Sequence, residues 1–330
     1  MTAHDVTIDL AAGGIAGLVA DVATHPVDTV RTRLWTQGHP TTSYRYRGLW
    51  HGMMEMAQKE GVSSLFKGFG SVVILTPAAH GLYFASYEWS KNALRKISNE
   101  KYRPNEASTH LCAGFVANAV GGLIWTPMDV VKQRQQAVVG NLYSGAIGGL
   151  TSIWREHGFF KGLQRGYWSG MATYGPFSAI YFMIYEQFKT FCIKQQNAAI
   201  QLRSGADAVA IPPEAKLNTM HFVLGGFIAG TVAAVATAPI DLVKTRMQVF
   251  DGCGYNGMLS TTSKIIREEG FLVFGRGLVA RVIWIAPGCA LTIAVYEDVR
   301  DILQHISPVE TPKGPQEANT GGTPVLIRHR

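Results

Sequence analysis

Long apolar stretches alternate with short polar segments along this chain, and the alternation occurs three times. Each repeat contains two helical patterns separated by a shorter amphipathic segment. We predict odd-numbered and even-numbered helices over these ranges: 8–36, 108–137 and 217–249 (odd), and 69–96, 166–194 and 276–304 (even). Self-similarity at a fixed period of roughly one hundred residues indicates internal structural repeats. The sequence therefore predicts three repeats, over 1–100, 101–200 and 201–307, followed by a tail at 308–330.

Two short polar motifs recur at equivalent places in the three repeats. The first is Pro-x-Asp-x-x-basic, which supplies Pro26, Asp28 and Arg31, then Pro127, Asp129 and Lys132, then Pro239, Asp241 and Lys244. The second is Tyr-Glu-x-x-basic, which supplies Tyr87, Glu88 and Lys91, then Tyr185, Glu186 and Lys189, then Tyr296, Glu297 and Arg300. One such motif arises easily by chance, whereas three in register indicate a shared role.

The composition favours helices in a membrane. The chain is 47% hydrophobic and 16% charged, with 36 glycines, and polar residues interrupt every apolar stretch. Those polar residues must face a wet interior, because ionisable groups facing lipid are costly. Small-residue clusters such as Ala12 to Gly17 are expected to let neighbouring helices approach closely. Each motif proline (Pro26, Pro127 and Pro239) removes a backbone hydrogen bond and is expected to bend its helix.

Charge, cysteines and segments outside the helices exclude several classes of protein. The net charge of +7 comes with few basic runs, which favours contact with anionic lipid over nucleic acid. The four cysteines are scattered, so neither a disulfide scaffold nor a structural zinc site is expected. The segment 195–216 is predicted to be a loop, and the tail from Pro308 to be disordered. His25 is expected to be solvated.

Threefold pseudosymmetry predicts which charges meet. Each motif acid would reach the base of the next odd helix, which pairs Asp28 with Lys132, Asp129 with Lys244, and Asp241 with Arg31. The Glu88, Glu186 and Glu297 units would form a second ring at the opposite face. Gln136 and Gln248 follow two of the acids at a fixed offset and are expected to brace them, while Trp35 occupies that place in the first repeat. A snorkelling pair at a helix end explains one such unit, but not six.

Over residues 8–304 these motifs resemble the mitochondrial carrier family. The resemblance implies an all-α membrane protein with six tilted helices around a central cavity, which opens alternately to the two sides of the mitochondrial inner membrane. It implies that the aspartate ring is a matrix gate and the glutamate ring a cytoplasmic gate. We also expect a monomer that contacts cardiolipin-like lipid, has no cofactor and lacks a cleaved presequence.

The resemblance also places the substrate contact points. They fall at Leu75 and Thr76, at Thr173 and Tyr174, and at Trp284 and Ile285, with Arg281 one turn deeper. No contact-point residue is basic, so a strongly anionic substrate is disfavoured. Residues that break the threefold symmetry are expected to set specificity. Asp21 is matched by Gly122 and Ala234, and His80 by Ser178 and Cys289. We expect a small cationic or neutral solute, and the acid, the imidazole and the thiol favour a cation, either a metal ion or an organic one.

Two subfamilies are similar to the chain. His80 before Tyr83-Phe84, and His221 at the start of the fifth helix, resemble the mitoferrins and imply ferrous iron as substrate, with both histidines as candidate metal ligands. Asp21 before Pro26, and Trp284-Ile285, resemble S-adenosylmethionine carriers, where an acid and aromatic rings would suit a sulfonium. The mitoferrin resemblance is narrowly favoured. The sequence contains no Gly-x-Ser-x-Gly, P-loop or His-Glu-x-x-His motif, so these signals give no support to an enzyme. A non-transporting membrane scaffold remains an alternative, and uniport, exchange and proton coupling remain open.

Overall fold

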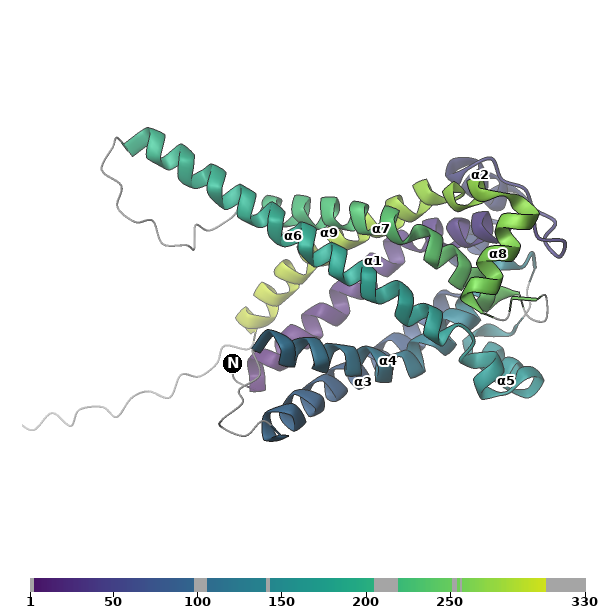
Figure 1. Ribbon diagram of the computed structural model, residues 1–330, viewed down its shortest axis with the longest axis horizontal. Helices are drawn as coiled ribbons and strands as arrows, with labels where there is room; N and C mark the ends of the chain where they lie inside the picture. Colours follow the sequence, from purple (N-terminus) through teal and green to yellow (C-terminus); the bar gives the residue numbers. More distant parts are fainter. Residues whose placement is uncertain are drawn as a thin grey trace, which may run out of the picture.

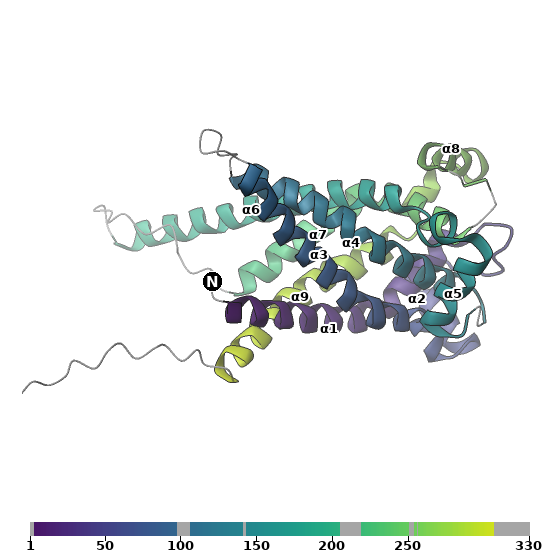
Figure 2. The same ribbon diagram turned by 90° about the horizontal axis from the view of Figure 1, so that it is seen from below.

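Six long helices form the body of the protein. The computed structural model describes residues 3–97, 106–140, 143–204, 219–250, 254–255 and 257–306, and these segments contain helices and turns without a strand. The long helices are α1 Ala3–Thr36, α3 Phe69–Ile97, α4 Glu106–Ala137, α6 Tyr167–Ser204, α7 Thr219–Val249 and α9 Leu278–Ile306. They run along the long axis of the molecule in both ribbon views (Figures 1 and 2). The predicted all-α class is confirmed.

Three short helices gather at one end of the bundle, opposite the N-terminus (Figure 1). They are α2 Leu49–Lys59, α5 Gly145–His157 and α8 Met258–Glu269. Each leads into a short turn of helix: η1 Val62–Phe66, η2 Phe159–Leu163 and η3 Phe271–Gly275. Apolar side chains of α2, α5 and α8 pack against the C-terminal ends of the odd helices, for example Ile153 against Val130 and Val131. This end of the protein is therefore well packed.

The helix α6 is longer than the sequence pattern predicted. It continues to Ser204, so the predicted loop at 195–216 is wrong for its first ten residues; 205–218, like the predicted tail 308–330, lies outside the described residues. Lys194 to Arg203 contains mostly good helix formers, and the first glycine after them is Gly205. The helix therefore has no local reason to stop near 194.

Four segments of the described chain are long and apolar enough to cross a membrane by length and composition: Val62–Leu94, Cys112–Ala137, Met220–Val249 and Phe271–Leu303. The helices α1 and α6 are similarly long but are not among these four segments of the described chain. The polar residues of α1 include Asp21 and Asp28, whose side chains line the central cavity. Interior polar groups thus lower the hydropathy of a helix without exposing charge to lipid.

Alanines, rather than the neighbouring glycines, form the tight seams of the odd helices. Ala12 and Ala16 of α1 are fully buried, as are their counterparts Ala113 and Ala117 in α4 and Ala229 and Ala233 in α7. A Cβ added at Gly13, Gly14 or Gly17 would meet nothing within 4 Å. The expectation that the whole Ala12–Gly17 cluster mediates close contact is therefore wrong for its glycines, since Gly14 and Gly17 face the central cavity.

A glycine that lies close to an odd helix precedes each even helix. Gly68, Gly166 and Gly277 precede α3, α6 and α9 with φ angles of 80°, 80° and 76°. An added Cβ would lie 2.9 Å from the Lys132 carbonyl oxygen, 2.9 Å from Gln248 Cγ and 2.8 Å from Trp35 Nε1, respectively. Both the positive φ and the short approach require glycine here. These contacts join each even helix to an odd helix of a neighbouring repeat.

Candidate functional site

A cavity of about 530 Å³ lies between the long helices. All six contribute to its lining: α1 through Asp21, α3 through His80, α4 through Trp125, α6 through Tyr174, α7 through Lys244 and α9 through Trp284. Its volume falls in the range of small-molecule sites. Aromatic and polar side chains share the walls, so the cavity suits a solute with both an apolar part and a polar part.

Most of the predicted contact residues line this cavity. They are Asp21, Thr76, His80, Thr173, Tyr174, Arg281, Trp284 and Ile285. Leu75 and His221 are not part of the lining. Leu75 stands at the same offset from its repeat's tyrosine as Thr173 and Trp284, which do line the cavity. The Thr173 hydroxyl is buried and donates to the Ser169 carbonyl oxygen of its own helix at 2.8 Å.

Two aromatic residues of the cavity, Trp125 and Phe177, were not predicted from the sequence. Trp125 stands two residues before Pro127, where the other repeats have Thr24 and Thr237. Comparing the repeats at that offset, as was done for Asp21, would have found it. Phe177 has no comparable signal, because aromatic residues are frequent throughout α6.

Asp21 is the cavity acid without a direct ionic partner. Its side chain is half-buried, and among the described residues no basic nitrogen lies within 4.0 Å of its carboxylate. His80 faces the same space, where its ring stands edge-on to Trp125 with centroids 5.0 Å apart. The His80 Nδ1 atom lies 3.0 Å from the Thr76 carbonyl oxygen. A carboxylate near aromatic rings is an arrangement that attracts organic cations.

Three ion pairs between odd helices form the floor of the cavity, and we call them the ion-pair layer. Lys132 Nζ lies 3.2 Å from Asp28 Oδ2, and Lys244 Nζ donates to Asp129 Oδ2 at 2.7 Å. Arg31 Nη1 lies 3.5 Å from Asp241 Oδ2. These six side chains are buried, and each pair joins two different repeats. The layer therefore ties α1, α4 and α7 together at the floor of the cavity.

The two candidate brace glutamines behave differently. Gln136 donates from Nε2 to Asp28 Oδ2 and to Thr29 Oγ1, both at 3.2 Å, and accepts a hydrogen bond from the Thr32 hydroxyl at 2.8 Å. Gln248 is equally buried, but its amide makes no hydrogen bond within the described part of the chain. Only Gln136 therefore connects an ion pair to a neighbouring helix through its amide.

The Arg31 junction uses aromatic rings and an additional arginine. The Arg31 guanidinium carbon lies 3.9 Å from the ring centroid of Trp284 and 4.6 Å from that of Trp35. Arg281 comes within 2.6 Å of Asp241 Oδ2 and also donates to the Thr237 hydroxyl at 2.7 Å. Asp241 thus has a closer partner than Arg31, and Arg31 itself lies 2.6 Å from Asp28 of its own helix.

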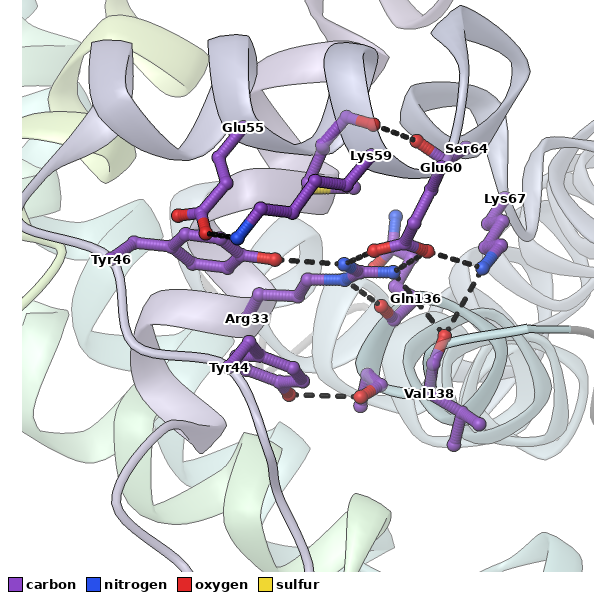
Figure 3. A network of polar contacts seen from close by, with 12 residues as sticks. Arg33, Tyr44, Tyr46, Glu55, Lys59, Glu60, Ser64, Lys67, Gln136 and Val138 are labelled. Atoms are coloured by element: carbon purple, nitrogen blue, oxygen red, sulfur yellow. Dashed lines mark hydrogen bonds and ion pairs between the residues drawn. The ribbon is translucent and has the colours of Figure 1, made fainter.

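A second layer of polar contacts lies beyond the ion-pair layer, toward the short helices. Arg33 forms a bidentate salt bridge with Glu60, and Lys67 approaches the same carboxylate at 3.0 Å. Arg33 also donates to the Gln136 carbonyl oxygen at 2.9 Å and to the Val138 carbonyl oxygen at 3.3 Å, as Figure 3 shows. These bonds satisfy carbonyls at the C-terminal end of α4, where helical partners run out.

The electrostatic consequence for Glu60 is clear. Hydrogen bonds from Arg33, and secondarily from Lys67, lower the pKa of Glu60 to about 2 although partial burial opposes this shift. The carboxylate therefore stays charged at any physiological pH and holds both cations.

The second layer recurs in the other repeats with one change. In the third repeat Arg246 pairs with Glu269, Arg276 lies 3.0 Å from the same carboxylate, and Arg246 Nε donates to the Trp35 carbonyl oxygen at 2.8 Å. In the second repeat Arg134 Nε donates to the Gln248 carbonyl oxygen at 3.0 Å, but His157 replaces the glutamate. Each arginine thus binds the end of the next odd helix in a closed cycle.

At the opposite end, the two described acids of the candidate second ring, Glu88 and Glu186, form no ion pair with another helix. Glu88 lies 3.0 Å from Lys91 of its own helix. In the described part of the chain Glu186 and Lys189 have no ionic partner within 4.0 Å, and the Glu297 side chain lies outside the described residues. Glu88, Glu186 and Arg300 are exposed. In this conformation the ion-pair layer at the cavity floor is formed from all three repeats, whereas the equivalent contacts of Glu88 are local.

The environment of His25 and the position of His221 differ from what the sequence predicted. His25 is buried rather than solvated, because its Nε2 atom lies 3.0 Å from the Lys67 carbonyl oxygen and its ring packs against Phe66 and Phe69. His80 reaches the cavity but His221 does not. Within the described residues no group of three or more His, Cys, Asp or Glu side chains is placed to hold a metal ion.

Comparison with known proteins places these features in a family context. The sequence model of the family described as mitochondrial carrier protein matches three times, over residues 3–98, 103–196 and 215–307. The chain is 38% identical over 305 residues to mitochondrial substrate carrier family protein E of Dictyostelium discoideum, a match that covers 89% of this chain and 95% of that protein.

Two other relatives carry names that refer to a particular type of carrier. The chain is 31% identical over 297 residues to the S-adenosylmethionine mitochondrial carrier protein homolog of Drosophila melanogaster, covering 89% of this chain and 92% of that protein. It is 29% identical over 303 residues to human mitoferrin-2, covering 88% and 76%, respectively.

Proposed function

Because the chain belongs to the mitochondrial carrier family, we propose that this transporter moves a small organic cation across the mitochondrial inner membrane. The observation that carries the proposal is the Asp21 carboxylate, which faces the cavity without a direct ionic partner among the described residues. A bound cation would supply the missing partner. Protein walls around a site lower the effective dielectric constant, so such a pairing is worth more there than in bulk water.

The walls of the cavity support an organic rather than an inorganic cation. Trp125, Tyr174, Tyr181 and Trp284 present aromatic surface to the cavity, and such surface attracts sulfonium and quaternary ammonium groups. The relative named as an S-adenosylmethionine carrier supports the same chemistry. S-adenosylmethionine is therefore the first solute to test.

Ferrous iron is the second candidate substrate. His80 and Cys289 both line the cavity, and one relative is named mitoferrin-2. Iron is placed second because the described residues offer no group of three or more metal-ligating side chains in one place.

The mechanism that we propose is alternating access between two gates. The ion-pair layer is the matrix gate, closed in this conformation by Asp28–Lys132, Asp129–Lys244 and Asp241–Arg31. The cytoplasmic gate consists of the Tyr87, Tyr185 and Tyr296 units with their acids and bases, which would pair between helices when the matrix gate opens. A bound solute would supply the free energy that separates the matrix pairs.

Reconstitution into liposomes tests the proposal. The native chain should exchange labelled S-adenosylmethionine faster than S-adenosylhomocysteine, which has nearly the same shape but a neutral thioether. Asp21→Asn should lower the exchange rate at least about tenfold, since it removes a charge partner from a low-dielectric site. The matched control Asp301→Asn changes an exposed acid of α9 outside the cavity and should leave exchange unchanged.

An iron carrier and a non-transporting scaffold would each give a different result in these experiments. Ferrous iron uptake that is lost in His80→Ala, together with no sulfonium exchange, would replace the proposed substrate with iron. A scaffold would carry neither solute. For a transporter, combining Asp129→Asn with Glu186→Gln abolishes flux in folded protein, whereas for a scaffold it lowers stability alone.

A further inference from the structure

Arg31, the base of the first repeat, is held between two indole rings. Its guanidinium carbon is 3.9 Å from the Trp284 centroid and 4.6 Å from the Trp35 centroid. The Nε and Nη1 atoms of Arg31 are buried, and neither donates a hydrogen bond to any residue that the structure describes. Cation–π attraction therefore replaces part of the hydrogen bonding that would otherwise fix this guanidinium.

The two rings differ in what else they can touch. Trp35 is 1% exposed and belongs to the apolar core between α1, α7 and η3. Trp284 lines the cavity, and the Lys132 Nζ atom lies 5.9 Å from its centroid. Trp284 is thus in contact both with a base of the matrix gate and with the space that a solute would occupy.

Arg31 also belongs to the loosest pair of the matrix gate. Its distance to Asp241 is 3.5 Å, compared with 3.2 Å and 2.7 Å in the other two pairs, and Arg281 occupies the nearer position at 2.6 Å from Asp241. A small weakening of the interactions that hold Arg31 therefore affects this pair before the others.

We propose that Trp284 couples solute binding to the matrix gate, because a cation stacked on its ring competes with Arg31 for the same π electrons. The inference rests on the proposed function, since it requires a cationic solute. The negative charge on the ring faces is limited, and two nearby cations repel each other, so each weakens the attraction of the ring for the other. Solute binding would loosen Arg31 and with it the Asp241–Arg31 pair.

This coupling would make selectivity a property of gate opening as well as of binding. A neutral solute of the same shape can fill the cavity and contact Trp284, but it adds no positive charge to compete with Arg31. It would therefore bind without loosening the gate to the same extent. Only a cationic solute would weaken the Trp284–Arg31 contact, and in this proposal that contact differs between the closed and open states of the gate. A solute shifts the balance of two states only through interactions that differ between them.

The test compares Trp284→Leu with Trp35→Leu, which removes a second ring from Arg31 but lies outside the cavity. Two quantities are measured in liposomes: the ratio of S-adenosylmethionine to S-adenosylhomocysteine exchange rates, and the one-way flux of S-adenosylmethionine without internal solute. Trp284→Leu should lower the ratio by roughly three- to tenfold, the range expected for one cation–π contact, and should raise one-way flux. Trp35→Leu should raise one-way flux and leave the ratio unchanged.

Trp284→Phe retains a smaller aromatic face and should be intermediate on both measurements, which guards against a variant that fails to fold. An unchanged ratio in Trp284→Leu would overturn the proposal. A lower ratio without increased one-way flux would also overturn it, because Trp284 would then only bind the solute. If the native chain transports neither compound, the proposed function fails and this inference with it, a result distinct from the two preceding ones.

Discussion

The junction between α1 and α4 and the junction between α7 and α1 hold equivalent charge pairs by different means. In the first, the Gln136 amide connects Asp28, Thr29 and Thr32. In the second, Arg281 takes the nearer position beside Asp241, and indole rings flank Arg31. The repeated motif therefore fixes where the charges stand, whereas residues outside the motif decide how firmly each charge is held. The three motifs are symmetric, but the ion pairs that they form are held by different neighbouring residues.

Removing Arg281 should have the largest effect on this comparison. Arg281→Leu leaves buried Asp241 with only the distant Arg31, and breaking a buried ion pair typically costs about 3 kcal/mol or more. We expect a loss of about 3 kcal/mol in the free energy of unfolding, measured by thermal unfolding in detergent. The control Arg267→Leu changes an exposed arginine on α8 and should be nearly neutral. A similar melting temperature for the two variants would mean that Arg31 fully replaces Arg281.

The two glutamines test whether the amide contacts stabilise the protein. Gln136→Leu leaves the buried Asp28 carboxylate and the Thr32 hydroxyl short of a partner, which should cost about 2 kcal/mol. Gln248→Leu removes an amide that makes no hydrogen bond within the described residues and should cost less than about 0.5 kcal/mol. The two variants serve as controls for each other in the same unfolding measurement. Equal losses of unfolding free energy in the two variants would show that the hydrogen bonds of the Gln136 amide do not stabilise the protein.

In the second layer the same two junctions should behave alike, because Glu60 and Glu269 each bind two cations. Glu60→Gln and Glu269→Gln are expected to cost similar amounts, about 1.5 kcal/mol each near neutral pH. Arg33 and Lys67 hold the pKa of Glu60 at about 2, below the ordinary value of 4.5. As the pH falls, the Glu60 carboxylate is therefore protonated at a higher pH in the unfolded chain than in the folded protein.

That difference gives a pH dependence of known sign. The stabilisation by Glu60 is fully present above pH 4.5 and is lost as the pH falls from 4.5 to about 2. The melting temperatures of the native chain and Glu60→Gln should converge over this interval. A constant gap between them down to pH 3 would contradict the assignment of the salt bridge as the cause.

The junction between α4 and α7 supplies the smallest expected effect. His157→Glu would place a carboxylate where the first and third repeats have Glu60 and Glu269, and we expect it to pair with Arg134 and Arg165, which correspond to the partners of those glutamates. Because an added pair near the surface is worth little, we expect a gain of about 0.5 kcal/mol. His157→Gln is the matched control without charge. A loss of stability in His157→Glu would mean that the contacts of His157 differ from those of the two glutamates.

The sequence predicted the positions of the charges better than their surroundings. Motif spacing and threefold symmetry identified the three acid–base pairs that the structure brings within 3.5 Å, because helical geometry places equivalent offsets at equivalent depths. The match of Gln248 with Gln136 was misleading, since a buried amide bonds only if local packing directs it to a partner. The competition of Arg281 for Asp241 was also missed, because it depends on how α9 packs against α7.

The same contrast applies to the cavity. Asp21, His80 and Trp284 were found because they break the symmetry or stand at fixed distances from a motif. Leu75 has the same offset as Thr173 and Trp284 but is not part of the lining, so the offset alone does not place a side chain in the cavity. The end of α6 was missed because no glycine or proline marks it before Gly205.

The balance of charge around the cavity has an electrical consequence. The lining contains four acids (Asp21, Asp28, Asp129 and Asp241) and four bases (Arg31, Lys132, Lys244 and Arg281), so the empty site is formally neutral. A monovalent cation would give the loaded site one positive charge, and moving one charge through the membrane potential involves about 2.3 kcal/mol per 100 mV. Exchange of a sulfonium for a neutral thioether would then be driven by voltage, whereas exchange of two like charges would be electrically silent.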